Sequence, residues 1–288
     1  MIDILLTILS FNILIVVFKL FDRFKIDNLQ GLIINYFVAG SCGIYFSNQE
    51  FSLTYIINAP WIYHASILGL LFIIVFNFYA TGTQKVGIAI TTIANKLSLL
   101  IPVGVALVIY PNEEISWIKI VGFMLAIIGI YLSATKKKQL SFDKKYIWLI
   151  LIVFVGQGIA DTIFNHAQQT VVGDEDKGLF FMVLLFTAAI SGIIILIGKS
   201  FQQKQRLQVK NLVGGIALGL PNFASLIFFF NALESSGLEA SQVFPVISMG
   251  VVIVSAIVGL IFFREKLTSA NWLGIGFAVL SIFVITFL

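Results

Sequence analysis

The chain has 288 residues, of which 59% are hydrophobic and 11% are charged. A soluble protein carries roughly 25% charged residues, so this composition excludes a water-soluble domain and indicates an integral membrane protein. The net charge of +4 comes from basic residues scattered over short loops, which excludes a contiguous nucleic-acid-binding domain. A single cysteine, Cys42, excludes an intrachain disulfide and a thiolate metal cluster from one chain.

Charge clusters and Pro, Asn and Gly breaks divide the chain into ten apolar segments of about 17–25 residues, the length that a bilayer requires. The first segment lacks the basic start and cleavage site of a secretory signal, so we expect it to stay as a membrane helix. The longest basic linker, KKKQLSFDKK at 136–145, separates five segments from five. The expected helices lie at 2–21, 29–46, 61–82, 86–109, 116–135, 146–166, 178–198, 209–231, 238–262 and 268–287.

The two halves of the chain resemble each other. A displacement of 150 residues places Gly87 on Gly237, Thr91 on Ser241 and Ser98 on Ser248, and a displacement of 152 places Glu113 on Glu265. Weak internal symmetry of this kind is typical of transporter repeats. Because five is odd, the second half must enter the membrane upside down relative to the first. The sequence therefore predicts an all-α membrane protein of ten transmembrane helices in two inverted five-helix repeats.

A longer motif adds a family resemblance. The stretch VFPVISMGVVIVSAIVGLIFFREKLTSANWLGIGFAVLSIFVIT combines a small-residue helix with Pro, a loop with Glu, and a final helix with Gly near its start. It resembles the second repeat of the drug/metabolite transporter superfamily, EamA-like branch, and Pro102, Glu113 and Gly122 carry a shorter form. The resemblance implies repeats at 1–135 and 146–288, joined by the linker 136–145, and carriage of small metabolites by alternating access.

Two departures limit what the resemblance implies about the substrate. The family often begins its first repeat with a Trp-Gly pair, whereas this chain has SFNILIVVFK. An Arg common in the second helix is absent, and Asn35 and Tyr36 stand in that region. Substrate assignments that depend on those residues do not carry over.

The basic residues predict the orientation of the chain. Fifteen of the eighteen Lys and Arg residues follow the first, third, fifth, seventh and ninth segments. The positive-inside rule places these loops in the cytoplasm and both termini outside. Members of the resembled family usually have both termini inside, and the charge count here favours the reverse. We expect a multi-pass protein of the bacterial plasma membrane.

Lys96 is the one charge in the segment 86–109. An unpaired ammonium at mid-membrane is costly, so three outcomes are open. Desolvation can neutralise the lysine, a carboxylate can pair with it, or it can face a water-filled cavity and bind an anionic group of a substrate. Asp161 is the candidate carboxylate. Thr92 lies on the same helix face as Lys96.

Other polar residues in the apolar segments form stripes. Thr91, Asn95 and Ser98 recur at helical spacing, and with Ser241, Ser248 and Ser255 they predict a close-packed seam between the segments 86–109 and 238–262. Gln157, Asp161 and Asn165 share one face. Asp161 either meets solvent near the membrane surface or faces a cavity.

The candidate substrate-binding residues rest on one observation, polar character inside an apolar segment. Single asparagines in membrane helices are more often interhelical hydrogen-bond partners than ligand groups, and both roles remain open for them. Glu113 and Glu265 stand at helix entrances, where capping and charge placement explain them. The candidates are Lys96, Thr92, Asn95, Asp161, Gln157, Asn12, Asn77 and Asn222.

These observations favour a secondary transporter of small metabolites, including export of amino-acid-like or other anionic or zwitterionic solutes. We expect no enzymatic activity, no cofactor and no metal site. The expected partners are the lipid bilayer and a small-molecule substrate, with a coupling ion and the oligomeric state left open. The alternatives are an intramembrane enzyme on lipid or isoprenoid substrates and a non-catalytic membrane assembly subunit. The sequence holds no Walker A, H-E-x-x-H or G-x-S-x-G motif.

The orientation is testable by thiol labelling. Single cysteines placed within 136–145 or 199–210, in a Cys42→Ala background, should resist a membrane-impermeant thiol reagent in whole cells, because these loops hold nine of the eighteen basic residues. Labelling should appear only after the membrane is opened. Rapid labelling of intact cells would reverse the orientation.

Overall fold

The computed structural model describes residues 2–47, 52–109, 117–133, 146–200, 208–237, 240–264 and 267–287. Almost all of these residues are helical, and the described ranges contain no strand. The long helices lie on the apolar segments that the sequence predicts. The helices are α1 (Ile2–Arg23), α2 (Asn28–Tyr45), α3 (Leu53–Asn58), α4 (Ile62–Lys85), α5 (Ile88–Leu97), α6 (Leu100–Ile109), α7 (Trp117–Ser133), α8 (Ile147–Thr170), α9 (Lys177–Ser200), α10 (Val209–Ser235), α11 (Ala240–Phe263) and α12 (Ser269–Phe287), with a 3-10 turn, η2 (Asp174–Asp176).

Within the described ranges, six helices are long and apolar enough to cross a bilayer, namely α1, α4, α8, α9, α10 and α11. Many of their large apolar side chains point outward, among them Leu5, Leu70 and Ile194, which are exposed. Such a surface would be costly in water and suits contact with lipid tails. The fold is therefore consistent with a multi-pass membrane protein.

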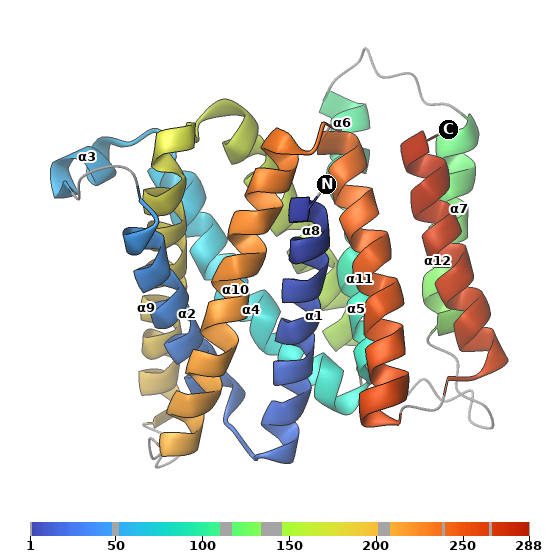
Figure 1. Ribbon diagram of the computed structural model, residues 1–288, viewed down its shortest axis with the longest axis horizontal. Coiled ribbons are helices and arrows are strands. Elements are labelled where there is room, and N and C mark those ends of the chain that lie inside the picture. Colours follow the sequence, from blue (N-terminus) through green and yellow to red (C-terminus); the bar gives the residue numbers. More distant parts are fainter. Residues whose placement is uncertain are drawn as a thin grey trace.

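The helices form three groups that lie side by side (Figure 1). The pair α2 and α9 packs on one flank, and the pair α7 and α12 packs on the other. Between them α1, α4, α8 and α10 surround the middle of the molecule, joined by α5 and α11. Both termini lie at the upper end of the view, and the turn from α1 to α2 lies at the lower end.

Glycines allow the closest helix crossings. A Cβ on Gly69 in α4 would lie 2.7 Å from Thr187 Cβ and 3.0 Å from the Ala188 nitrogen in α9. Small residues let two backbones approach in this way, which strengthens van der Waals packing where lipid offers no hydrophobic driving force. The flank formed by α2 and α9 uses the same device at Gly43 and Gly178.

The expected continuous helix at 86–109 is wrong. The structure divides it into α5 and α6, with a turn at Ser98 and Leu99. Pro102 explains the break, because it has no N–H to donate to the carbonyl of Ser98 and its ring clashes with that carbonyl in a continuous helix. The N–H of Ile101 donates to the Ser98 oxygen instead, at 2.9 Å. Irregular backbone at this depth is tolerated only inside protein or beside a cavity.

The structure also bears on the predicted loop after α2 and on the predicted seam. The polar loop after α2 contains α3, which begins after Ser52, whose side chain accepts a hydrogen bond from the Tyr55 N–H. The two helices of the predicted seam are in contact, because α5 packs on α11, and Ile93, Leu97, Val252 and Ala256 belong to one buried apolar cluster. The side chain of Thr91 lies against Gly82 of α4, and Ser98 Oγ lies 3.3 Å from Asp161 of α8, so a seam through these two residues stays a prediction. The side chain of Ser241, the linker 136–145 and the two loop glutamates, Glu113 and Glu265, lie outside the described residues.

The crossing of α4 and α9 gives a stability test. Gly69→Ala should lower the free energy of unfolding in detergent by about 1–3 kcal/mol, because the new methyl group overlaps atoms of α9 that cannot move freely. Gly198→Ala in α9 is the matched control, since nothing lies within 4 Å of its Cβ position. That control should stay within about 1 kcal/mol of the wild type. Equal stabilities of the two variants would contradict the close crossing.

Candidate functional site

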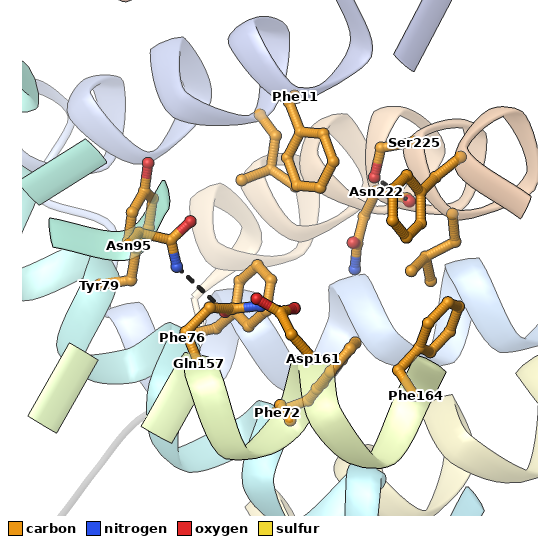
Figure 2. A pocket seen from close by; sticks show the side chains of 14 residues that line it. Phe11, Phe72, Phe76, Tyr79, Asn95, Gln157, Asp161, Phe164, Asn222 and Ser225 are labelled. Atoms are coloured by element: carbon orange, nitrogen blue, oxygen red, sulfur yellow. Dashed lines mark hydrogen bonds between the residues drawn. The ribbon is translucent and has the colours of Figure 1, made fainter. Parts of the chain in front are cut away.

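A pocket lies between α1, α4, α5, α8 and α10, at the middle of the helices (Figure 2). Its free volume is about 50 Å³, which is room for a few water molecules, so a metabolite-sized solute requires its side chains to move apart. Its wall is mainly aromatic and aliphatic, with a few polar groups. The lining residues are Phe11, Leu14, Phe72, Phe76, Tyr79, Asn95, Gln157, Ala160, Asp161, Phe164, Asn222, Ser225, Leu226 and Phe229.

A chain of hydrogen bonds crosses one wall of the pocket. Asn95 Nδ2 donates to Gln157 Oε1 at 3.0 Å, and Gln157 Nε2 donates to Asp161 Oδ1 at 2.7 Å. Ser98 Oγ lies 3.3 Å from Asp161 Oδ2 and also donates to the backbone oxygen of Asn95. The chain therefore holds Asp161 in a fixed orientation at the pocket.

The local sequence explains how these groups meet. Gln157 and Asp161 are four residues apart in α8, so they lie one above the other on the same face. Asn95 lies in the last turn of α5, and Ser98 lies in the break that follows. The break ends α5 beside α8, which lets a polar turn face the carboxylate.

Lys96 lies next to the pocket and does not line it. Its Nζ is 3.8 Å from the centre of the Phe11 ring, and Phe11 is a lining residue. A cation over an aromatic face is stabilised by about 2 kcal/mol when water is excluded. Lys96 and Asp161 attract each other electrostatically, but no salt-bridge contact joins these two described residues. The ammonium of Lys96 thus contacts a ring that also lines the pocket.

Asn222 supplies a second polar point on the opposite wall. Its Nδ2 donates to Asn35 Oδ1 in α2 at 3.1 Å, and both residues are buried. Pro221, directly before it, leaves the fourth preceding carbonyl of α10 without its helical partner. The Asn35 contact holds the carboxamide of Asn222 in place, and Figure 2 shows this side chain pointing toward the pocket.

The remaining predicted residues lie outside the lining. Thr92 contacts the pocket indirectly, since its hydroxyl lies 3.0 Å from the hydroxyl of the lining residue Tyr79. Asn12 is buried and donates to the backbone oxygen of Ile8 in its own helix at 2.8 Å. Asn77 lies on a different, polar groove at the lower end of α1, α2 and α4. Asn95, Gln157, Asp161 and Asn222 are the predicted residues that the structure brings together.

The polar residues of the sequence do not indicate which phenylalanines form the aromatic wall. The chain has 28 phenylalanines, and composition alone does not separate those in a pocket from those facing lipid. The internal repeat was the available signal. Five pairs of lining residues differ by 150 in number, the displacement that aligns the two halves. They are Phe11 and Asp161, Leu14 and Phe164, Phe72 and Asn222, Phe76 and Leu226, and Tyr79 and Phe229.

No group of three or more His, Cys, Asp or Glu side chains gathers in the described ranges. What the pocket offers is one carboxylate, several carboxamides and many aromatic rings. This set can bind a small molecule that carries both polar and apolar parts.

The chain is similar to known proteins whose function is not stated. The fold matches a protein of known crystal structure with a TM-score of 0.66, over 99% of this chain and 95% of the other, at 15% identity, so the likeness concerns the fold alone. No family model matches the chain. An uncharacterized protein of Haemophilus influenzae is 30% identical over 223 residues, which are 77% of this chain and 74% of that protein. The chain belongs to the same family as this Haemophilus influenzae protein.

Proposed function

We propose that the protein is a secondary transporter of small metabolites that works by alternating access around the central pocket. In this proposal it has ten transmembrane helices in two inverted five-helix repeats and is an EamA-like member of the drug/metabolite transporter superfamily. The observation that carries the proposal is the pocket itself. It lies halfway along the helices, draws its wall from both halves of the chain, and holds a carboxylate that a lipid-facing helix would not tolerate.

Helix packing supports the inverted repeat. If α1 corresponds to α8, α2 to α9, α4 to α10 and α7 to α12, the contact of α1 with α10 corresponds to that of α8 with α4. Likewise, the contact of α2 with α10 corresponds to that of α9 with α4, and all four contacts occur. The corresponding helices α7 and α12 lie side by side and run in opposite directions (Figure 1). Opposite directions are what an inverted repeat requires.

Two glycines support the same alignment. Gly87 has a φ of 127° and Gly237 has a φ of 76°, and their numbers differ by 150. Each lies shortly before a corresponding helix, α5 or α11. Residues with side chains rarely adopt such φ values, so an entry bend of this kind favours glycine in both halves.

The broken helix supports transport more specifically. Transporters commonly build their sites from helices that are interrupted near the middle of the membrane, where freed backbone groups and side chains face the substrate. Here the break at Ser98 and Leu99 lies beside Asp161, and Lys96 lies two residues before it. We infer an anionic or zwitterionic solute whose negative group reaches Lys96 when Phe11 turns aside.

A flux assay tests the function. Purified protein should first be screened by thermal shift against amino acids, organic acids and sugar phosphates, because a ligand that binds the native state raises its apparent stability. A compound that binds should then accumulate in proteoliposomes, and Lys96→Met should reduce its flux by at least about tenfold, the loss expected when a charge-assisted contact of about 1.5–3 kcal/mol is removed. Full flux through a folded Lys96→Met protein would remove Lys96 from the site. Conversion of lipid substrates into products without any flux would replace the transporter with an intramembrane enzyme.

Stability measurements separate binding from structural roles. Because no contact joins Lys96 and Asp161, the double change Lys96→Met with Asp161→Asn should show a coupling energy of about 0.5–1.5 kcal/mol. A structural ion pair would show about 3–5 kcal/mol, the cost of leaving one buried charge alone. The coupling is measured by unfolding the wild type, both single variants and the double variant in detergent. A value in the higher range would make the pair structural.

A further inference from the structure

The pocket lies between two layers of aromatic rings, most of which pack edge-to-face or tilted against one another. The upper layer comprises Phe164, Phe180, Phe181, Phe229 and Phe230, with neighbouring ring centres 5.7–6.2 Å apart. The lower layer comprises Phe18, Phe21, Phe76 and Tyr79, with neighbouring ring centres 5.8–6.3 Å apart. Each layer shares two residues with the pocket lining and is otherwise fully buried. A solute in the pocket therefore meets an aromatic layer in either direction.

An ionic cluster fastens the upper layer. Lys177, at the start of α9, pairs with Glu234, near the end of α10, and lies 3.2 Å from Asp174. The ammonium also lies 5.0 Å from the ring centre of Phe230, a member of the upper layer. The pair thus ties α9 to α10 directly above the rings. We call Lys177 and Glu234 the upper latch.

A neutral cluster fastens the lower layer. Asn28 Nδ2 donates to Gln84 Oε1 at 3.1 Å, and Gln84 Nε2 donates to Asn28 Oδ1 at 2.8 Å. The same Gln84 nitrogen lies 3.3 Å from the backbone oxygen of Phe18, a member of the lower layer. The carboxamides thus tie α2, α4 and α1 together, and we call Asn28 and Gln84 the lower latch.

A polar groove reaches the lower latch from the surface. Asp22, Lys25 and Asn77 line it together with Asn28 and Gln84, and it opens at the lower ends of α1, α2 and α4. Phe21 of the lower layer forms its inner wall. The groove and the central pocket are therefore separated by the lower layer. Asn77, which the sequence predicts as a candidate substrate-binding residue, lies at this entrance.

We propose that the two latches are the gates of the central pocket and that their unequal chemistry sets which end opens. The inference rests on the proposed transport function. The upper latch joins charges that are partly exposed, so salt weakens it. The lower latch joins neutral carboxamides, whose hydrogen bonds respond little to ionic strength. High salt and loss of the upper ion pair both favour opening toward the end that carries the two termini, and loss of the lower latch favours opening through the groove.

Accessibility of a cysteine in the pocket tests the gates without a substrate. The reporter is Ala160→Cys, a lining position, in a Cys42→Ala background, with the purified protein reconstituted in vesicles. A membrane-impermeant thiol reagent is applied from each side in turn. Glu234→Gln should raise the labelling rate from the terminal side about two- to fivefold, the effect of an exposed ion pair, and lower it from the opposite side. Gln84→Ala should shift labelling the other way.

Matched variants control for the loss of a charge or a carboxamide. Asp3→Asn removes a carboxylate at the same end as Glu234, and Asn58→Ala removes an exposed carboxamide in α3. Both should label like the reporter protein. Raising the ionic strength should reproduce the effect of Glu234→Gln and should add nothing to that variant.

The outcomes distinguish the gates from the function. If the reporter labels from both sides but the latch variants match their controls, the gates are elsewhere and the transport proposal stands. If the reporter labels from neither side in any variant, the pocket does not alternate and both proposals fail. Labelling from the same side in Glu234→Gln and Gln84→Ala would overturn the assignment of opposite gates.

Discussion

Lipid offers no hydrogen bonds, and this constraint organises the middle of the molecule. Asp161 can remain among apolar helices because Gln157 donates to one of its oxygens, because the hydroxyl of Ser98 lies 3.3 Å from the other, and because the ammonium of Lys96 is near. These partners come from α5, α8 and the turn between α5 and α6. These helices must therefore meet at one place. The pocket is the space left there between the polar groups and the bulky aromatic rings that surround them.

The break after α5 allows residues of the first half of the chain to contact residues of the second half. In a continuous helix through 86–109, the carbonyl of Ser98 would accept a hydrogen bond from the backbone N–H of residue 102. Pro102 has no such N–H and therefore prevents that arrangement. The freed turn instead lies against Asp161, which is 63 residues later. Asn95 makes the same connection to Gln157. Motion of one half relative to the other must change these bonds, so the polar chain links the shape of the pocket to the arrangement of the halves.

Hydropathy and charge predicted where the long helices lie, because lipid imposes a length and an apolar surface on each of them. They did not predict the break, since a single Pro within an apolar run is compatible with either a kink or a divided helix. Polar residues inside apolar segments predicted Asn95, Gln157, Asp161 and Asn222 at the pocket. Asn77 and Asn12 followed the same pattern but meet other surroundings, because helical spacing gives a relative face and no direction in space. The sequence did not predict which phenylalanines line the pocket, because a phenylalanine side chain is equally compatible with contact to lipid and with a pocket wall.

The order of synthesis gives the buried lysine a further consequence. Lys96 leaves the ribosome 65 residues before Asp161, so the segment that carries it enters the membrane before its counter-charge exists. That segment is also two short helices, and neither is long enough to cross a bilayer alone. Its final position must therefore wait for α8. The first half of the chain therefore reaches its final packing only when α8 of the second half is present, because α5 and α6 both pack against α8.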